Sequence, residues 1–156
     1  MLKKILIAVI IILVGIQFIP VERTNPPVTQ DIHPPENVAL ILKTSCYDCH
    51  SNETIWPWYS YVAPVSFLVS GDVHNGRKRL NFSEWDRYDV KRRNKKMDGI
   101  LELVEKGVMP LSIYTTMHSD AKLNAEKIKT IKEWVLENEN INDDEPIRYK
   151  KEDEKD

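Results

Sequence analysis

Residues 45–52 read SCYDCHSN and contain the only two cysteines of the 156-residue chain. Cys46 and Cys49 stand three positions apart, and His50 directly follows the second. Residues at i, i+3 and i+4 of a helix share one face, with β-carbons about 5–6 Å apart. The spacing therefore predicts two thiols and one imidazole on one side of a single helical turn.

C-x-x-C-H is the attachment signature of a c-type haem. Two thiols on one helix face can add to the vinyl groups on neighbouring pyrroles, and the adjoining imidazole then meets the iron from one side. We predict one covalent haem c per chain, held by Cys46 and Cys49, with His50 as the proximal iron ligand.

Three other interpretations of the two cysteines stay open. A thioredoxin-like pair needs a βαβ context, and no strand pattern precedes Cys46. A Cys2His2 zinc site could recruit His74 or His118, although neither has the usual paired-histidine spacing. A structural disulfide beside a chance histidine is the third. The spacing favours haem over each of them.

Near the N-terminus, Lys3 and Lys4 precede an apolar run over residues 5–21. No A-x-A cleavage pattern closes the run, and no cysteine follows it as a lipoprotein anchor would require. At about 1.5 Å per residue the run covers roughly 25 Å, slightly less than a bilayer core of about 30 Å. We predict an uncleaved signal-anchor over residues 1–22, which crosses the bacterial inner membrane through residues 5–21. A cleaved signal peptide is the alternative. Because basic residues stay on the cytoplasmic side, the remainder is predicted to face the periplasm.

Composition divides the rest of the chain. Residues 20–35 contain five prolines, and residues 23–35 are predicted to form an extended linker. Residues 36–138 are predicted to form the folded domain. Residues 139–156, which are rich in acidic side chains, are predicted to be a disordered tail.

Helical periodicity runs through the predicted domain, and no segment alternates strictly enough to be a strand. Gly76 and Gly107 are predicted helix stops, and Asn124 is a predicted N-cap. The fold class predicted is a small all-α, cytochrome c-like domain on the N-terminal transmembrane anchor. The predicted helices cover residues 34–46, 64–74, 88–106 and a last segment after Asn124.

Three motifs follow one another in this domain: CYDCHSNETIWPWYSYVAPVSF from residue 46, GRKRLNFSEW from residue 76 and GVMPLSIYTTMHSDAKL from residue 107. In this succession the chain resembles the haem-binding domain family of bacterial envelope proteins, which is related in layout to monohaem c-type cytochromes. The resemblance covers about residues 36–138. It implies a single covalent haem c in a helical domain, and it implies no catalytic activity.

The sixth position on the iron needs a second ligand, and Met109 is the predicted one. It lies between Gly107 and Pro110, on a loop that proline stiffens. Small c-type cytochromes likewise place their distal methionine on a loop before the last helix. His118 remains the alternative ligand. Met97 falls on an inward helical position and is predicted to be core.

Four aromatic residues follow the motif and are predicted to pack in the core, where they would shield the haem from water. They are Trp56, Trp58, Tyr59 and Tyr61. The carbonyl of Pro57, within this cluster, is a candidate acceptor for the other ring nitrogen of His50.

Charge narrows the choice of partners. The formal net charge is only −2, which does not indicate nucleic acid. Residues 77–96 nevertheless carry nine basic against three acidic side chains. These cations could steer an acidic redox partner or bond the haem propionates, and a simply solvated surface is an equal alternative.

No catalytic triad, phosphate loop or carboxylate pair indicates another class of enzyme. The predicted function is a membrane-anchored periplasmic electron carrier with iron ligated by His50 and Met109. The alternative is a haem-based sensor or enzyme with an open sixth position on the iron.

Overall fold

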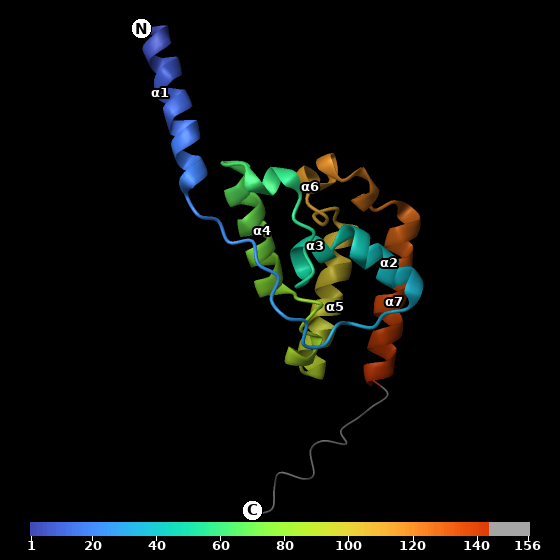
Figure 1. Cartoon of the computed structure of the whole chain (residues 1–156). Helices are drawn as coiled ribbons and strands as arrows, with labels where there is room; N and C mark the ends of the chain where they lie inside the picture. The colour runs from blue at the N-terminus through green and yellow to red at the C-terminus, as the bar shows by residue number, and fades with distance from the viewer. Residues whose placement is uncertain (144–156) are drawn as a thin grey trace, which may run out of the picture. The chain divides into compact units, whose positions relative to one another are not determined.

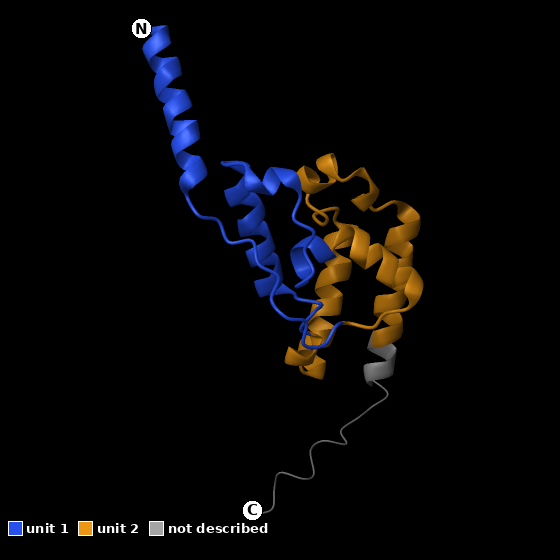
Figure 2. Ribbon diagram, in the orientation of Figure 1, with its two compact units in different colours: residues 1–31, 47–84 blue, residues 32–46, 85–156 orange. Residues whose placement is uncertain are grey.

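The computed structural model describes the backbone of residues 1–143 and the side chains to residue 138. Over these residues the chain forms helices and no strand, apart from one isolated bridge between Gln30 and Glu84. The all-α prediction is therefore confirmed (Figure 1). The chain divides into two compact units (Figure 2): unit 1 holds residues 1–31 and 47–84, and unit 2 holds residues 32–46 and 85 onward.

Unit 1 is organised around α4, which packs against α3 and η2. α4 runs three residues beyond Gly76 and ends at Arg79, so the predicted stop at Gly76 is wrong. The elements of this unit are α1 (Leu2–Gly15), η1 (Ile16–Phe18), α3 (Tyr47–His50), η2 (Trp58–Tyr61) and α4 (Val65–Arg79).

Unit 2 is a small bundle in which α7 packs on both α5 and α2. The Asp89 carboxylate caps α5 by accepting from the Arg92 amide at 2.8 Å. Gly107 follows α5 with a left-handed φ of 65°, as a helix stop should. The elements are α2 (Glu36–Ser45), η3 (Trp85–Arg87), α5 (Val90–Glu105), α6 (Ser112–Met117), η4 (Ser119–Ala121) and α7 (Ala125–Asp143).

The core of unit 2 is apolar, and Met97 is buried in it as predicted. The predicted N-cap is also present, since the Asn124 side chain accepts from the Lys127 amide at 2.8 Å. The predicted tail begins within α7, which extends to Asp143. The rest of that tail, residues 144–156, lies outside the described residues.

The predicted transmembrane anchor is wrong. α1 has 14 residues and covers only about 21 Å at about 1.5 Å per residue, against a bilayer core of about 30 Å. Among residues 1–143, no helix combines the length and the apolarity needed to cross a membrane. The apolar run that the sequence presents as continuous is divided after Gly15, where η1 begins. The predicted inner-membrane location, which depended on this anchor, is overturned by the same finding.

Gln17, which lies within η1, binds the apolar run to the loop before α4. Its side chain donates to the Ala63 carbonyl at 3.0 Å and accepts from the Ala63 amide at 3.0 Å. A polar side chain in the middle of the run is thus engaged with the loop before α4.

Residues 22–31, which we call the strap, are extended but fastened to the rest of unit 1. The linker predicted over residues 23–35 is thus extended in this part, and it is also hydrogen-bonded to the folded residues of unit 1. The hydrogen bonds include Ser70 Oγ to the Glu22 carbonyl (2.7 Å), Arg23 Nη1 to the Ser60 carbonyl (3.1 Å), Asn52 Nδ2 to the Pro27 carbonyl (2.9 Å) and Tyr47 Oη to the Asp31 carboxylate (2.9 Å).

Candidate functional site

The motif Cys46 to His50 spans the end of one helix and the whole of the next. Cys46 is the C-cap of α2, with φ −129° and ψ −36°, and it closes the first segment of unit 2. Cys49 and His50 lie in α3, within unit 1. The predicted single helical turn is therefore interrupted at Cys46, because the backbone leaves helical geometry at that residue.

Gly76 lets α3 lie directly against α4. A β-carbon at position 76 would collide with the carbonyl oxygen of Cys49 and would come within 3.2 Å of the Cys49 β-carbon. Glycine is thus required here for close approach of two backbones, although it sits inside a helix. In the sequence, Gly76 is the first residue of the motif GRKRLNFSEW.

The imidazole of His50 is held by two backbone carbonyls. Nδ1 lies 3.1 Å from the carbonyl oxygen of Gly76 and 3.0 Å from that of Leu80. Because carbonyl oxygens only accept, Nδ1 must carry the hydrogen, which leaves the lone pair on Nε2. The predicted acceptor Pro57 is wrong, since its carbonyl accepts from the amide and the hydroxyl of Ser60 instead.

Burial lowers the pKa of His50, and hydrogen bonding to the Leu80 and Gly76 carbonyls only partly opposes that effect. The ring is therefore neutral at neutral pH. Its edge faces the ring of Phe82, with 6.3 Å between centroids, and the Phe82 amide donates to the His50 carbonyl at 2.7 Å. The ring thus has a defined tautomer and a defined place.

Burial also raises the pKa of the Cys49 thiol to about 12, helped by the charges of Asp48 and Asp72 and opposed by Arg77. A thiol that stays protonated is unlike the thiolate of a thioredoxin-like pair, whose pKa is lowered. Across the described residues, no group of three or more His, Cys, Asp and Glu side chains is placed to hold a metal ion. Neither the redox interpretation nor the zinc interpretation is supported by this geometry.

Arg77 fastens the chain that follows the motif. Its Nε donates to the Ser51 carbonyl at 2.7 Å, and its Nη2 donates to Thr54 Oγ1 at 2.8 Å. The same guanidinium binds the strap through the Thr24 carbonyl (2.7 Å) and Asn25 Oδ1 (2.8 Å). The sequence predicts Arg77 among the cations that could steer a partner, but its donors are engaged within unit 1.

The aromatic cluster is not the core feature that the sequence predicts. Trp58 is 73% exposed and Tyr61 is 59% exposed, while Trp56 and Tyr59 are half-buried. The reason is that η2 is a single short turn whose one buried residue is Ser60. Val62, Val65 and Leu68, which lie next along the chain, are exposed as well.

The two candidate distal ligands lie in unit 2. Met109 is half-buried on the loop between α5 and α6, where the sequence predicts it, and its amide donates to the Leu103 carbonyl at 3.2 Å. His118 is the C-cap of α6, and its ring stacks on Tyr114 with 4.3 Å between centroids. His118 is therefore engaged in ring stacking, whereas Met109 lies on the loop between α5 and α6.

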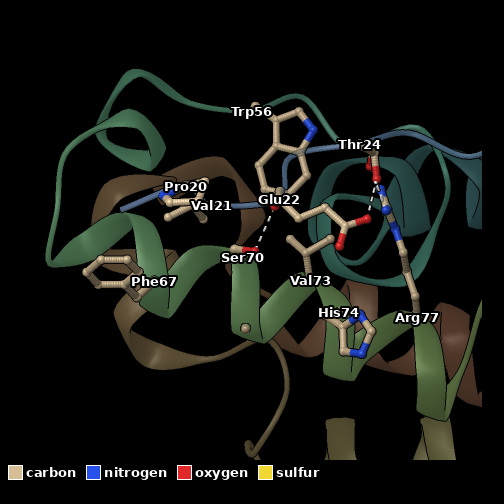
Figure 3. A pocket seen from close by; sticks show the side chains of 11 residues that line it. Pro20, Val21, Glu22, Thr24, Trp56, Phe67, Ser70, Val73, His74 and Arg77 are labelled. Carbon is tan, nitrogen blue, oxygen red and sulfur yellow. Dashed lines mark hydrogen bonds between the residues drawn. The ribbon is translucent and has the colours of Figure 1, made fainter. Parts of the chain in front are cut away.

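Unit 1 also contains a cavity of about 440 Å³ (Figure 3). It is bounded by residues 20–24, by Trp56 and by one side of α4, and neither Cys49 nor His50 lines it. Gly71 of α4 is part of its wall, and a β-carbon at that position would meet nothing within 4 Å. Arg77, which binds the Ser51 carbonyl directly after the motif, also lines the cavity.

Comparison with models of protein families matches residues 11–137 to the family described as haem-binding domain. Neither a curated protein nor a solved structure matches the chain. The matched residues include the motif Cys46 to His50 and the loop of Met109. The chain therefore belongs to the haem-binding domain family, and haem is its cofactor.

Proposed function

We propose that the chain holds one haem c covalently through Cys46 and Cys49, and that it carries electrons with His50 and Met109 as the axial ligands of the iron. The observation that supports this proposal most directly is the pair of carbonyls on His50 Nδ1. They fix the tautomer in which Nε2 keeps its lone pair, as an iron ligand requires.

The groups that hold the His50 ring come from the C-terminal end of α4. The carbonyls of Gly76 and Leu80 hold the ring, and the Leu80 amide in turn donates to the Gly76 carbonyl at 2.9 Å. Backbone acceptors of this kind orient a ligating imidazole and raise its basicity. The end of α4 thus fits the role of positioning His50.

The surface of unit 1 also fits a large apolar cofactor. Trp58, Tyr61, Val65 and Leu68 expose apolar area that the described part of unit 1 leaves open to solvent. Burial of such area stabilises by about 25 cal/mol per Å². A bound haem would supply one-electron redox chemistry at its iron.

Whether Met109 ligates the iron distinguishes an electron carrier from a haem-based sensor or enzyme. A thioether as sixth ligand would favour the reduced state and would leave no position for a small molecule. The loop position of Met109, between Gly107 and α6, supports this role. An open sixth position would instead indicate a sensor or an enzyme.

The first prediction concerns attachment. Expression with a c-type maturation system should give haem that remains on the polypeptide after acid–acetone extraction. Cys46→Ser and Cys49→Ser should each leave a single thioether, and the double variant should release all haem. Ser45→Ala, which changes the residue next to the motif, is the matched control and should retain haem fully. A colourless wild-type protein would contradict the proposal.

The second prediction concerns the redox partner. Lys91, Arg92 and Lys95 are exposed on α5, so they are available to attract an acidic protein. Electron transfer to such a partner should slow as ionic strength rises, because exposed charges are screened beyond about 10 Å at 0.1 M salt. Stopped-flow rates of the wild type and of Lys91→Gln/Lys95→Gln test this. Rates that do not respond to salt would remove these residues from docking.

A further inference from the structure

A small cavity in unit 2 is lined by four segments of that unit, one of which contributes Trp85 of η3. Its walls come from the beginning of α5, the later part of α7 and the chain just before α2, which pass close to one another in Figure 1. The volume is about 170 Å³. Cavities that take drug-sized ligands measure about 300–1,000 Å³, so this one has room only for a smaller molecule.

Arg93 gives the cavity a positive charge. No Asp or Glu side chain is among its described lining residues, whose other polar members are His33, Asn94 and Asn138. Arg93 Nε is buried and has no hydrogen-bond partner among the described residues. A half-buried guanidinium that meets no counter-charge among the described lining residues is costly, and an anion in the cavity would offset that cost.

Comparison with the neighbouring Arg92 shows that a place in the cavity wall is particular to Arg93. Arg92 is 71% exposed, lies 3.9 Å from the Asp89 carboxylate and is not part of the cavity wall. Two consecutive arginines of one helix therefore have different surroundings. Arg92 is a solvated surface residue, and Arg93 faces a cavity.

The remaining walls are apolar and aromatic. Trp85 and Trp134 face the cavity, and the side chains of Ile32 and Met97, both almost fully buried, close it. A ligand that suits this lining has one anionic end for Arg93 and a short apolar part for the tryptophans. Arginine presents a planar fork of donors that matches a carboxylate better than a spherical anion.

We propose that this cavity binds a small monocarboxylate, with its carboxylate on the Arg93 guanidinium and its short apolar chain against Trp85 and Trp134. The cavity is formed by unit 2 alone. The proposal is therefore independent of the haem function proposed above, and either one can fail without the other.

Butyrate is the probe, titrated into the full chain at constant ionic strength, with heat and tryptophan fluorescence as readouts. Butyramide, which has the same shape without the charge, should bind far more weakly. Arg93→Gln should weaken butyrate binding by about tenfold to a hundredfold, the range for a lost charged hydrogen bond. Arg93→Lys keeps the charge without the fork and should lose less affinity. Arg92→Gln is the matched control and should bind butyrate as the wild type does.

Four outcomes would overturn the proposal. Equal binding of butyrate and butyramide would show that charge is not recognised. An equal loss in the Arg92 and Arg93 variants would indicate general surface electrostatics. Butyrate binding that appears only when the chain is cut after Asp143 would assign the cavity to the chain's own acidic residues. Butyrate binding that is present in a Cys46→Ala/Cys49→Ala chain and absent from the haem-loaded wild type would assign the cavity to the carboxylates of haem.

Discussion

Gly76→Ala is expected to push α3 away from α4 and to prevent stable haem attachment. The new β-carbon would meet backbone atoms of Cys49, which cannot move aside as the end of a flexible side chain could. Overpacking of this kind costs about 1–3 kcal/mol, and displacement of the residue 76 carbonyl away from His50 Nδ1 would add to that cost. Urea denaturation should therefore show lower stability, and the amount of haem per polypeptide should fall sharply.

Gly71→Ala is the control on the same helix. A β-carbon there meets nothing within 4 Å, so the substitution should only reduce the flexibility of the unfolded chain. Replacing glycine by alanine inside a helix should then stabilise by about 0.5–1 kcal/mol. If both variants retain wild-type stability and wild-type haem content, the close approach at Gly76 does not support the site.

Met109→Ala is expected to lower the reduction potential and to open the iron to carbon monoxide. Axial ligands and their surroundings set haem potentials over a range of about 0.8 V, so loss of a thioether should shift the potential by roughly a tenth of that range or more. The ferric spectrum should also lose any sulfur-to-iron absorption near its red end. Potentiometry and spectra recorded with and without carbon monoxide measure these changes.

Two further variants make the test of Met109 specific. Met117→Ala removes a methionine that is 57% exposed on α6, and it should leave both the potential and the spectrum unchanged. His118→Ala tests the alternative ligand and should affect only its stacking on Tyr114. A wild-type protein that binds carbon monoxide as readily as Met109→Ala would favour the sensor or enzyme.

Local patterns in the sequence determined much of the architecture. The all-α class, the helix that follows Asn124 and the loop of Met109 were all predicted correctly. Each depends on signals within a few residues, such as periodic apolar positions, an N-cap or a left-handed glycine. α6 was missed because its six residues are too few to show a period. The motif Cys46 to His50 was recognisable from its spacing alone, and family membership independently supports haem as the cofactor of the chain.

Contacts between distant segments decided the rest. Gly76 serves as a point of close approach, Arg77 binds four groups from the strap and from the chain after the motif, and the ring of His50 is held by α4. The N-terminal apolar run ends as a helix at Gly15, while Gln17 binds the Ala63 backbone. None of these features follows from spacing along the chain, because each depends on which backbone group arrives from elsewhere in the sequence. Glycines 71 and 76 illustrate the difference: both lie in α4, and only the approach of Cys49 makes one of them irreplaceable.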